Sequence, residues 1–356
     1  MRILQIIDSL EAGGAERMAV NYANALCKKV EFSGLIATRK EGNLKNQINQ
    51  SVDYLFLNAI KKIDFKAIKK LYNYCKTNQI THIHAHSSSY QIAVIIKLFT
   101  PKINIIWHNH FGNNEFLKNR KLLFLKIGSS FFSKVIAVNQ NLEYWSKTVL
   151  KHKNVIYLPN FASKNSIEIQ ETYLQGNQEK KILCLANLRI EKNHFMLIEV
   201  AKNVVAKHPD WSFHLVGKDF HDAYSQKLKT SIEKENLKEN IFIYGTKTDT
   251  DFIISQASIC ILTSESEGLP VALIEYGMQK KPVVATAVGE IPNIIIHKKN
   301  GYLAPSNNVN LFSKYLLELI GNHNLQNKIG EAFFQTIFKD FSEEKVIDKY
   351  LKFIKS

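Results

Sequence analysis

Apolar positions follow two different periods along the first half of the chain. Short, nearly continuous apolar runs are typical of buried strands, whereas apolar positions three or four residues apart are typical of amphipathic helices. The first pattern predicts strands at residues 3–7, 32–38, 80–84, 103–108 and 135–138, and the second predicts helices at 15–28, 65–76, 90–99 and 142–149. This alternation predicts a parallel sheet with helices on both of its faces.

The alternation stops once and then restarts. Residues 163–178 show neither period, and we interpret them as an interdomain linker. The patterns beyond them predict strands at 181–186, 211–216, 241–244, 259–263 and 282–286, helices at 194–207, 224–236, 251–257, 270–279 and 311–320, and a last amphipathic helix at 343–353. The chain has 356 residues, about twice the length of a usual ~150-residue domain. We therefore predict two Rossmann-like, doubly wound α/β domains.

The charge of the chain is unevenly distributed. Lys and Arg number 47 against 32 Asp and Glu, a formal net charge of +15. Residues 1–162 contain 23 basic and 9 acidic residues, a net charge of +14, whereas residues 163–356 carry a net +1. An excess confined to one half indicates an anionic partner, which is a membrane surface, a phosphate-bearing substrate or nucleic acid. No motif that reads DNA or RNA is visible, so we expect no nucleic acid as partner.

Cysteine usage and hydropathy bear on the compartment. The four cysteines are far apart, lie in apolar sequence and form no C-x-x-C motif, which is typical of reduced core residues in a cytosolic protein. The apolar pattern of a strand begins directly at the N-terminus, so we expect no secretory signal. No apolar run reaches the ~18 residues that span a bilayer. We expect a cytoplasmic protein that meets a membrane only peripherally, at the inner face of the plasma membrane.

Open parallel sheets bind ligands beyond the carboxyl ends of their strands, so polar residues there are the functional candidates. The first strand is followed by Gly13 and Gly14 and then by a helix. Two glycines allow a ligand to approach the backbone closely, and a helix N-terminus attracts anions. A simple tight turn is the alternative interpretation. Nothing here matches G-x-G-x-x-G, which disfavours a nicotinamide cofactor.

Histidines cluster at the ends of two predicted strands, with His82, His84 and His86 at one and His108 and His110 at the other. Strand alternation places the members of each set on one face. Their number would permit a zinc site, but no carboxylate or cysteine accompanies them at ligand spacing, so we expect no bound metal. His82 and His84 suit core or capping positions. His110, where a strand gives way to a loop, is the candidate for function.

The densest functional signal is the segment TSESEGLPVALIE at residues 263–275. Pro270 suits the first turn of a helix, which places Glu267 in the preceding loop and Glu275 inside the helix. Carboxylates accept several hydrogen bonds from sugar hydroxyls, and backbone N–H groups around Gly268 and Leu269 suit phosphates. The separation of the two carboxylates is comparable with the span of a nucleoside diphosphate sugar from hexose to ribose. A helix-start carboxylate and a solvated helix residue are the alternative interpretation.

The first strand of the second domain ends in ANLRIEKNH at residues 186–194. Arg189 and Lys192 in this segment can neutralise a diphosphate, the first as a planar fork and the second as a point charge. Solvated surface cations are the alternative.

Together these residues make the chain resemble the family 4 glycosyltransferases, retaining enzymes with the GT-B fold, of the bacterial surface-polysaccharide type. The most specific element is the E-x7-E motif, matched by Glu267 and Glu275. It is accompanied by PVVAT at 282–286, Gly289, NGYLAP at 300–305, the glycine loop at 13–16, His110 and LPN at 158–160. The resemblance extends over nearly the whole chain and is strongest between residues 181 and 305.

The resemblance implies two Rossmann-like domains facing across a cleft. Residues 1–162 would form the acceptor-side domain, 163–178 the linker and 179–339 the nucleotide-sugar domain. Residues 340–356 would form a C-terminal helix that packs back on the first domain.

The resemblance also implies roles for single residues. Glu275 would hold the nucleotide ribose, Glu267 would face the hydroxyls of the donor sugar, and Lys192 would stabilise the leaving diphosphate. The glycine loop at 13–14 would lie near the diphosphate and the acceptor, and His110 would contact the transferred sugar. No cofactor is implied, because the nucleotide sugar, expected to be UDP-linked, is a co-substrate. No metal is implied either, because positively charged side chains and helix N-termini would stabilise the charge of the diphosphate.

Three departures from the family pattern stand out. The usual G-R-L-x3-K reads Ala186, Asn187, Leu188 and Lys192, so Asn187 replaces the diphosphate arginine, and Arg189 is the candidate substitute. The usual P-N-G-I-D reads PNFAS at 159–163, and a Gly-Gly pair reads Gly289-Glu290.

The resemblance implies a hexosyltransferase whose acceptor is a glycan or lipid-linked glycan of surface polysaccharide biosynthesis. The basic first domain would dock on an anionic membrane surface through an interfacial helix at 116–126 and a lysine face at 61–70. Two other functions are open, a nucleotide-sugar epimerase on the same fold and a catalytically silent sugar- or anion-binding protein. Donor base, donor sugar, linkage and oligomeric state are not readable from the sequence.

Overall fold

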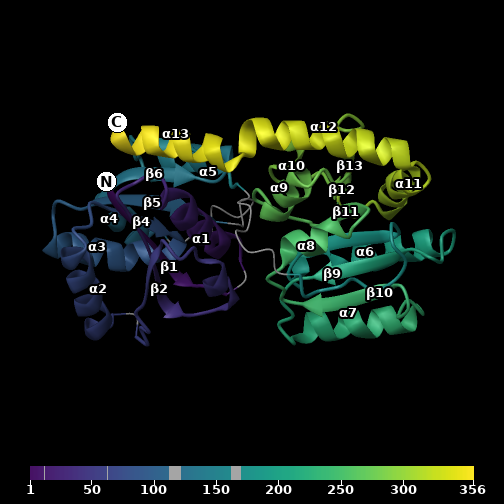
Figure 1. Ribbon diagram of the computed structural model, residues 1–356, viewed down its shortest axis with the longest axis horizontal. Coiled ribbons are helices and arrows are strands. Elements are labelled where there is room, and N and C mark those ends of the chain that lie inside the picture. Colours follow the sequence, from purple (N-terminus) through teal and green to yellow (C-terminus); the bar gives the residue numbers. More distant parts are fainter. Residues whose placement is uncertain (12, 62, 112–121, 162–169) are drawn as a thin grey trace. The chain divides into compact units, whose positions relative to one another are not determined.

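The computed structural model describes residues 1–11, 13–61, 63–111, 122–161 and 170–356. The chain divides into two compact units, Met1–Ser166 together with Glu343–Ser356, and Ile167–Ser342. Figure 1 shows that each unit is built on its own sheet with helices packed against it.

The first unit contains a parallel sheet in the strand order β3-β2-β1-β4-β5-β6-β7. Its elements are β1 Arg2–Ser9, α1 Gly14–Leu26, β2 Phe32–Lys40, η1 Asn43–Gln47, β3 Asp53–Phe56, α2 Phe65–Thr77, β4 His82–His86, η2 Ser87–Ser89, α3 Tyr90–Phe99, β5 Asn104–Asn109, α4 Leu123–Ser129, β6 Phe132–Ala137, α5 Gln140–Thr148, β7 Val155–Tyr157 and α13 Glu343–Lys355. The winding direction reverses between β1 and β4, which makes the carboxyl ends of these two strands the switch point of the sheet.

The second unit repeats this arrangement in the order β10-β9-β8-β11-β12-β13, again with parallel pairs. Its elements are β8 Lys181–Leu185, η4 Ile190–Lys192, α6 His194–Val205, β9 Ser212–Val216, α7 Ala223–Lys234, β10 Ile241–Gly245, α8 Thr250–Ser255, β11 Ile259–Leu262, α9 Val271–Met278, β12 Val283–Thr286, α10 Ile291–Ile294, β13 Tyr302–Ala304, α11 Val309–Ile320 and α12 His323–Phe341. Its switch point lies between β8 and β11. The prediction of two Rossmann-like, doubly wound units is confirmed.

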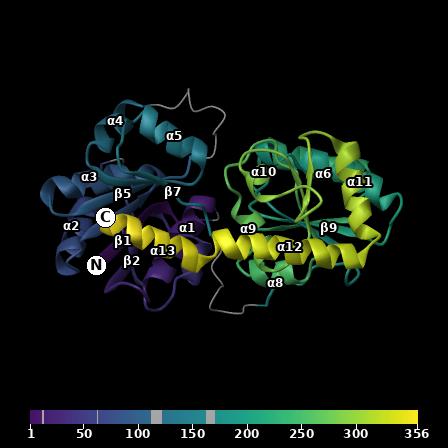
Figure 2. The ribbon, with the colours of Figure 1, turned by 90° about the horizontal axis from the view of Figure 1, so that it is seen from above.

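The last helix of the chain packs on the first unit. Figure 2 shows α13 lying along α1. The buried rings of Tyr350 and Tyr22 join the two helices, with centroids 5.1 Å apart, and Lys29 Nζ lies 2.6 Å from Asp348 Oδ1. The apolar face of α13 (Val346, Ile347, Tyr350 and Ile354) is buried, as its helical spacing predicts.

The structure differs from the sequence reading at the domain boundaries. Part of the expected linker, residues 170–178, is attached to the second unit, because Thr172 and Leu174 are buried and both the backbone N–H and the hydroxyl of Thr172 donate to Asp249. The rest of the expected linker, residues 163–169, lies outside the part of the chain that the structure describes. The expected boundary at 339–340 falls inside α12, a helix that the periodicity analysis missed.

The expected interfacial helix is only partly described. Residues 116–121 lie outside the described ranges, and the helix observed next to them is α4, Leu123–Ser129. Leu123, Phe124 and Ile127 on this helix are exposed. Within the described ranges, no helix is both long and apolar enough to cross a membrane.

Candidate functional site

The sequence candidates of the second unit gather at the switch point of its sheet. Strands β8 and β11 pair directly, so the loops that follow them begin side by side. The first loop carries Asn187, Arg189 and Lys192, and the second carries Glu267, Gly268 and Leu269. Switch points are where open α/β sheets bind ligands.

An ion pair joins these two loops. Lys192 Nζ lies 2.6 Å from Glu267 Oε1, and the exposed fractions of the two side chains are 22% and 6%. The Ser264 hydroxyl donates to the same Glu267 oxygen over 2.6 Å. A carboxylate this buried needs such partners, because an unpaired buried charge is costly. The pair therefore holds one cation and one carboxylate at a defined place at the sheet edge.

The backbone holds the two loops together as well. Glu265 N–H donates to the Glu191 carbonyl over 2.9 Å, and the Thr263 hydroxyl donates to the Lys192 carbonyl over 3.1 Å. These hydrogen bonds restrict the positions of Lys192 and Glu267 in addition to the ion pair between the two side chains. The site is thus largely preorganised, which is the condition for electrostatic stabilisation of a reacting group.

A third loop, after β12, packs under Glu267. Gly289 has φ +56°, and a Cβ atom there would lie 1.9 Å from the Glu267 carbonyl oxygen. Both the backbone conformation and the close approach require glycine. The next residue, Glu290, is buried and donates its N–H to the Gly268 carbonyl over 3.2 Å.

Helix α9 carries the second glutamate of the motif. It begins at Val271, so Pro270 directly precedes the helix rather than occupying its first turn. Glu275 lies in α9 and is half-buried. The hydroxyl of the neighbouring Tyr276 accepts a hydrogen bond from Leu185 N–H over 2.7 Å, which anchors α9 to β8.

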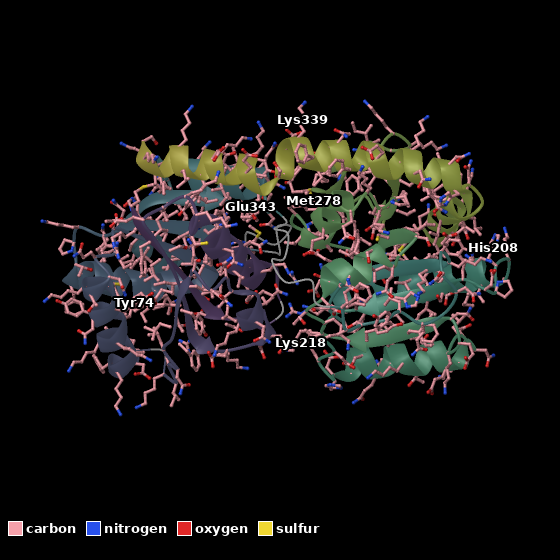
Figure 3. All side chains as sticks on the ribbon, in the orientation of Figure 1. Tyr74, His208, Lys218, Met278, Lys339 and Glu343 are labelled. Atoms are coloured by element: carbon pink, nitrogen blue, oxygen red, sulfur yellow. The ribbon has the colours of Figure 1, made fainter. Side chains whose placement is uncertain are left out.

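Asn187 and Arg189 have other partners. Asn187 Oδ1 accepts the backbone N–H of Lys218 over 2.8 Å; Lys218 is labelled in Figure 3. The Arg189 guanidinium lies 4.7 Å from the centroid of the Phe220 ring, with Nη1 3.8 Å from Glu191 Oε1, and 52% of its side chain is exposed. The structure therefore brings Lys192 and Glu267 into contact and directs Arg189 towards Phe220.

The remaining candidates belong to the first unit. Gly13 is the residue before α1 and Gly14 is the first residue of that helix. His110 follows β5, is half-buried, and its Nε2 lies 2.9 Å from His86 Nδ1. His86 Nε2 lies 2.9 Å from Gln5 Oε1 in turn. A hydrogen-bonded chain thus leads from the strand end at His110 to the centre of the sheet.

This chain is part of a layer of histidines, His84, His86, His108 and His110, under α1 and α13. Nitrogen atoms of His84 and His108 lie 3.1 Å apart, and Tyr22 and Tyr350 pack against His84 from the two helices. Burial lowers the pKa of His84, His86 and His108 well below the usual range, and neighbouring histidines lower it further. Burial also lowers the pKa of His110 to about 3, so all four are neutral at pH 7.

Three of these histidines lie close enough together to share one metal ion. Nitrogen atoms of His84, His86 and His108 lie within 4.8 Å of one another. The His84 and His108 rings are inclined by 9°, and the His84 and His86 rings are stacked at 27° with centroids 4.4 Å apart. Near-parallel rings do not converge on one tetrahedral ion. The arrangement fits a hydrogen-bonded polar layer better than a metal centre.

Sequence reasoning missed three groups at these sheet edges. Ser264, which holds Glu267, lies within the quoted motif but was given no role. Asp8 and Ser88 meet at the switch point of the first sheet, where the Ser88 hydroxyl donates to Asp8 over 2.5 Å. Asp8 lies at the end of β1, Ser88 lies just beyond β4 and Ser264 lies just beyond β11. Polar residues at the carboxyl ends of apolar strands are the signal that could have found them.

Comparisons with known proteins agree with this geometry. Residues 12–162 match the family model described as Glycosyltransferase Family 4, and residues 165–335 match that described as Glycosyl transferases group 1. The chain is 25% identical over 345 residues to an uncharacterised glycosyltransferase of Haemophilus influenzae, covering 95% of each chain. It is 26% identical over 357 residues to the amylovoran biosynthesis glycosyltransferase AmsD of Erwinia amylovora, covering 98% of each.

A solved structure shares the fold over the whole length. HepE from Anabaena, solved in complex with UDP and glucose, superposes with a TM-score of 0.80 at 17% identity and full coverage of both chains. The two family models together span both units, and both sheets have the doubly wound order. The chain therefore belongs to the family 4 type of glycosyltransferases with the GT-B fold.

Proposed function

We propose that this glycosyltransferase moves a hexose-type sugar, with retention, from a UDP-linked donor to a glycan or lipid-linked glycan in surface polysaccharide biosynthesis. The observation that carries the proposal is the Lys192–Glu267 pair at the switch point of the second sheet. The fold shared with HepE, solved with UDP and glucose, supports the donor class. The relationship to AmsD, named for amylovoran biosynthesis, supports the pathway class.

In this proposal, Lys192 and Glu267 act on the two sides of the bond between the donor sugar and the diphosphate. Lys192 stays beside the diphosphate and stabilises the negative charge that grows as it leaves. Glu267 accepts hydrogen bonds from hydroxyls of the donor sugar and stabilises the positive charge that develops at its ring. Ser264 positions Glu267 for this work through its 2.6 Å hydrogen bond.

The proposed transfer takes place on one face of the sugar. The bond between the anomeric carbon and the diphosphate oxygen breaks, and its electron pair leaves with the diphosphate. The acceptor oxygen forms the new bond to the anomeric carbon from the same face. Its proton passes to the departing diphosphate oxygen, so no protein base is consumed.

The proposal includes no metal ion. Charge on the diphosphate is met by Lys192 and by backbone N–H groups at Gly268, Leu269 and the start of α9, where the helix dipole is positive. Glu275, further along α9, is assigned to the ribose hydroxyls. Asn187 stands where the family has its diphosphate arginine. We propose Arg189 as its substitute, which requires its guanidinium to leave Phe220 when the donor binds.

The first unit supplies the acceptor side. We assign the loop at Gly13 and Gly14 to the diphosphate and acceptor, and His110 to the transferred sugar. The exposed lysines 61, 66, 69 and 70 and the exposed apolar face of α4 support docking on an anionic membrane surface.

A donor screen tests the proposal. Purified protein, without added metal and with a chelator, is combined with UDP-, GDP- and dTDP-sugars, and melting temperature and donor hydrolysis are measured. We expect a UDP-sugar to raise the melting temperature and to be hydrolysed slowly. Glu275→Gln should abolish that shift, whereas the control Glu199→Gln, an exposed glutamate of α6, should retain it.

Other outcomes would contradict the proposal. A wild-type protein that no nucleotide sugar stabilises would indicate a silent binding protein. Formation of an epimeric nucleotide sugar without any acceptor would indicate an epimerase. Turnover that appears only after a divalent cation is added would refute the metal-free mechanism.

A further inference from the structure

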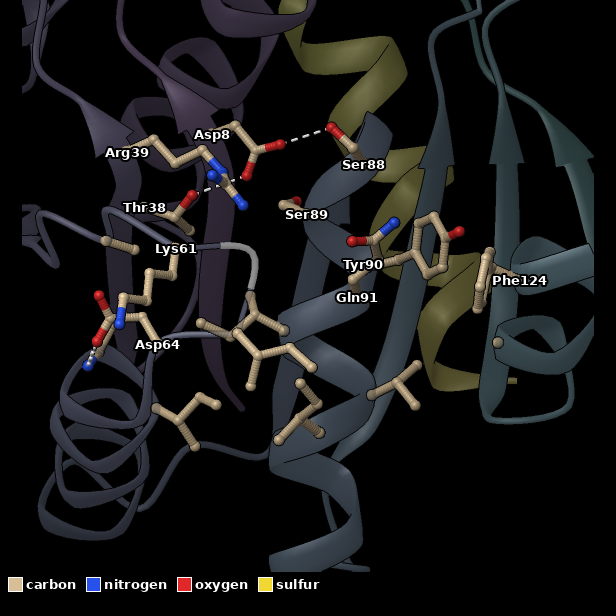
Figure 4. A pocket seen from close by; sticks show the side chains of 18 of the residues that line it. Asp8, Thr38, Arg39, Lys61, Asp64, Ser88, Ser89, Tyr90, Gln91 and Phe124 are labelled. Carbon is tan, nitrogen blue, oxygen red and sulfur yellow. Dashed lines mark hydrogen bonds between the residues drawn. The ribbon is translucent and has the colours of Figure 1, made fainter. Parts of the chain in front are cut away.

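A cavity of about 440 Å³ lies in the first unit between α2 and α3 and reaches α4. Figure 4 shows it from close by. Its interior is apolar, formed by Ala67 and Ile68 of α2 and by Ile92 and Ile95 of α3. Ligand pockets commonly have volumes of about 300–1,000 Å³.

One end of the cavity is polar and coincides with the switch point of the first sheet. Asp8 at the end of β1 accepts hydrogen bonds from the Thr38 hydroxyl over 2.7 Å and from the Ser88 hydroxyl over 2.5 Å. Arg39 and Lys61 line the same cavity, and both are exposed. Figure 4 draws Arg39 beside Asp8 and Lys61 further along the wall, beside Asp64. The Asp8 end therefore offers a carboxylate, hydroxyl groups and the Arg39 cation, a set that suits a phosphorylated head group bearing hydroxyls.

The other side of the cavity is lined by apolar side chains that solvent reaches. Ile63, Phe124 and Ile127 line it with exposed fractions of 59%, 74% and 58%. Large apolar side chains exposed together commonly mark a ligand groove or an interaction surface. Two lysines close in sequence to these apolar residues, Lys66 on α2 and Lys126 on α4, are also exposed.

We propose that this cavity binds the hydrocarbon chain of a single amphiphile whose phosphorylated, hydroxyl-bearing head lies at the Asp8–Ser88 end. The apolar interior accounts for the hydrocarbon chain, and the polar end with Arg39 accounts for the head group. The inference rests on the proposed function, which it deepens: the head would lie at the carboxyl edge of β1, so the ligand is a lipid-linked acceptor. The occupant is one chain inside the cavity, rather than a bilayer surface against its rim.

The test uses the full-length protein and n-alkyl phosphates with six, eight or ten carbons, kept below their critical micelle concentrations, in titration calorimetry. Each methylene group that enters the cavity should tighten binding about fourfold, until the cavity is full. Inorganic phosphate alone should bind far more weakly, as should an alkyl glucoside of the same chain length.

Matched variants locate the site. Phe124→Ser and Ile127→Ser should each weaken decyl phosphate binding by about tenfold, because each removes apolar contact at an already exposed position. The controls Phe338→Ser and Ile296→Ser change residues of the second unit with similar exposed fractions, 54% and 56%, and should leave binding unchanged. Ala59→Trp, which places a large ring at a lining position, should abolish binding.

Three results would overturn the inference. The first is an affinity that does not depend on chain length, since it would describe a phosphate site only. The second is equal loss in the variants and their controls. The third is flotation with vesicles of equal phosphatidylglycerol and phosphatidylcholine without binding of any alkyl phosphate, which would describe a surface contact. Donor-induced thermal shift, measured on the same samples, reports separately on the proposed function.

Discussion

The buried histidine layer of the first unit makes its stability depend steeply on pH. His84, His86, His108 and His110 are neutral in the folded protein because burial lowers the pKa of each. In the unfolded chain the same side chains have a pKa of about 6.5. Below that pH the unfolded state binds protons that the folded state does not, so acid favours unfolding.

The size of the effect follows from the number of histidines. Each contributes about 1.4 kcal/mol of lost unfolding free energy between pH 7.5 and pH 5.5, so four contribute about 5 kcal/mol. The stability is fully present above the unfolded pKa and decreases as pH falls below it. A loss of this size is comparable with the whole stability of a small domain, about 5–15 kcal/mol.

Tryptophan fluorescence can follow the first unit alone. Trp107 and Trp145 lie in this unit and Trp211 lies in the other, and the chain has three tryptophans. In the Trp211→Phe variant, urea unfolding measured between pH 7.5 and pH 5.5 therefore reports on the histidine layer. We expect the urea midpoint to fall over this range, and the unfolding free energy to fall by about 5 kcal/mol, which corresponds to an average slope of about two protons.

Removing one histidine should lower that average slope by about half a proton. His84→Gln is expected to reduce the pH-dependent loss by about 1.4 kcal/mol, whatever it does to stability at pH 7.5. The exposed His323 provides the control, and His323→Gln should leave the slope unchanged. A slope of one proton or less, or a slope that His84→Gln does not change, would refute the reasoning.

Two further predictions concern the site in the second unit. Lys192→Met should reduce donor hydrolysis by about 10²–10³-fold, because one preorganised charge contact is lost; Lys202→Met, at an exposed ion pair of α6, should leave the rate unchanged, and an equal loss in both would assign the effect to stability. Gly289→Ala should lower both the melting temperature and the donor-induced shift, because φ is +56° and the new Cβ would meet the Glu267 carbonyl. A fully active Gly289→Ala variant would show that the loop under Glu267 is not needed.

Much of the fold was readable from periodicity. Nearly continuous apolar runs predicted the central strands of both sheets, and their alternation with helices predicted parallel, doubly wound sheets. The short strands β3, β7 and β13 were missed. The equally short β11 and β12 were predicted because all four residues of each are buried and apolar or small, whereas β3 is only partly buried and shows no such run. Helix α12 was missed although its 19 residues make it the longest helix described in the chain.

The candidate site was readable for a different reason. Because parallel strands end at one edge of a sheet, polar residues that follow different strands meet there whatever their distance in sequence. Lys192 and Glu267 are 75 positions apart and lie in contact for that reason. The rule placed the loops near each other, but it did not say which side chains would touch: Arg189, the expected diphosphate ligand, faces Phe220 instead.

The sequence by itself determined the two-domain α/β class, the uneven charge and the loops in which functional residues stand, since these depend on local pattern and composition. Only the tertiary structure decided that His86 bonds His110, that Asp8 and Ser88 close one end of a cavity, and that Thr172 belongs to the second unit. Each of these contacts joins residues more than 20 positions apart. Their partners depend on side-chain packing between elements, which no local period encodes.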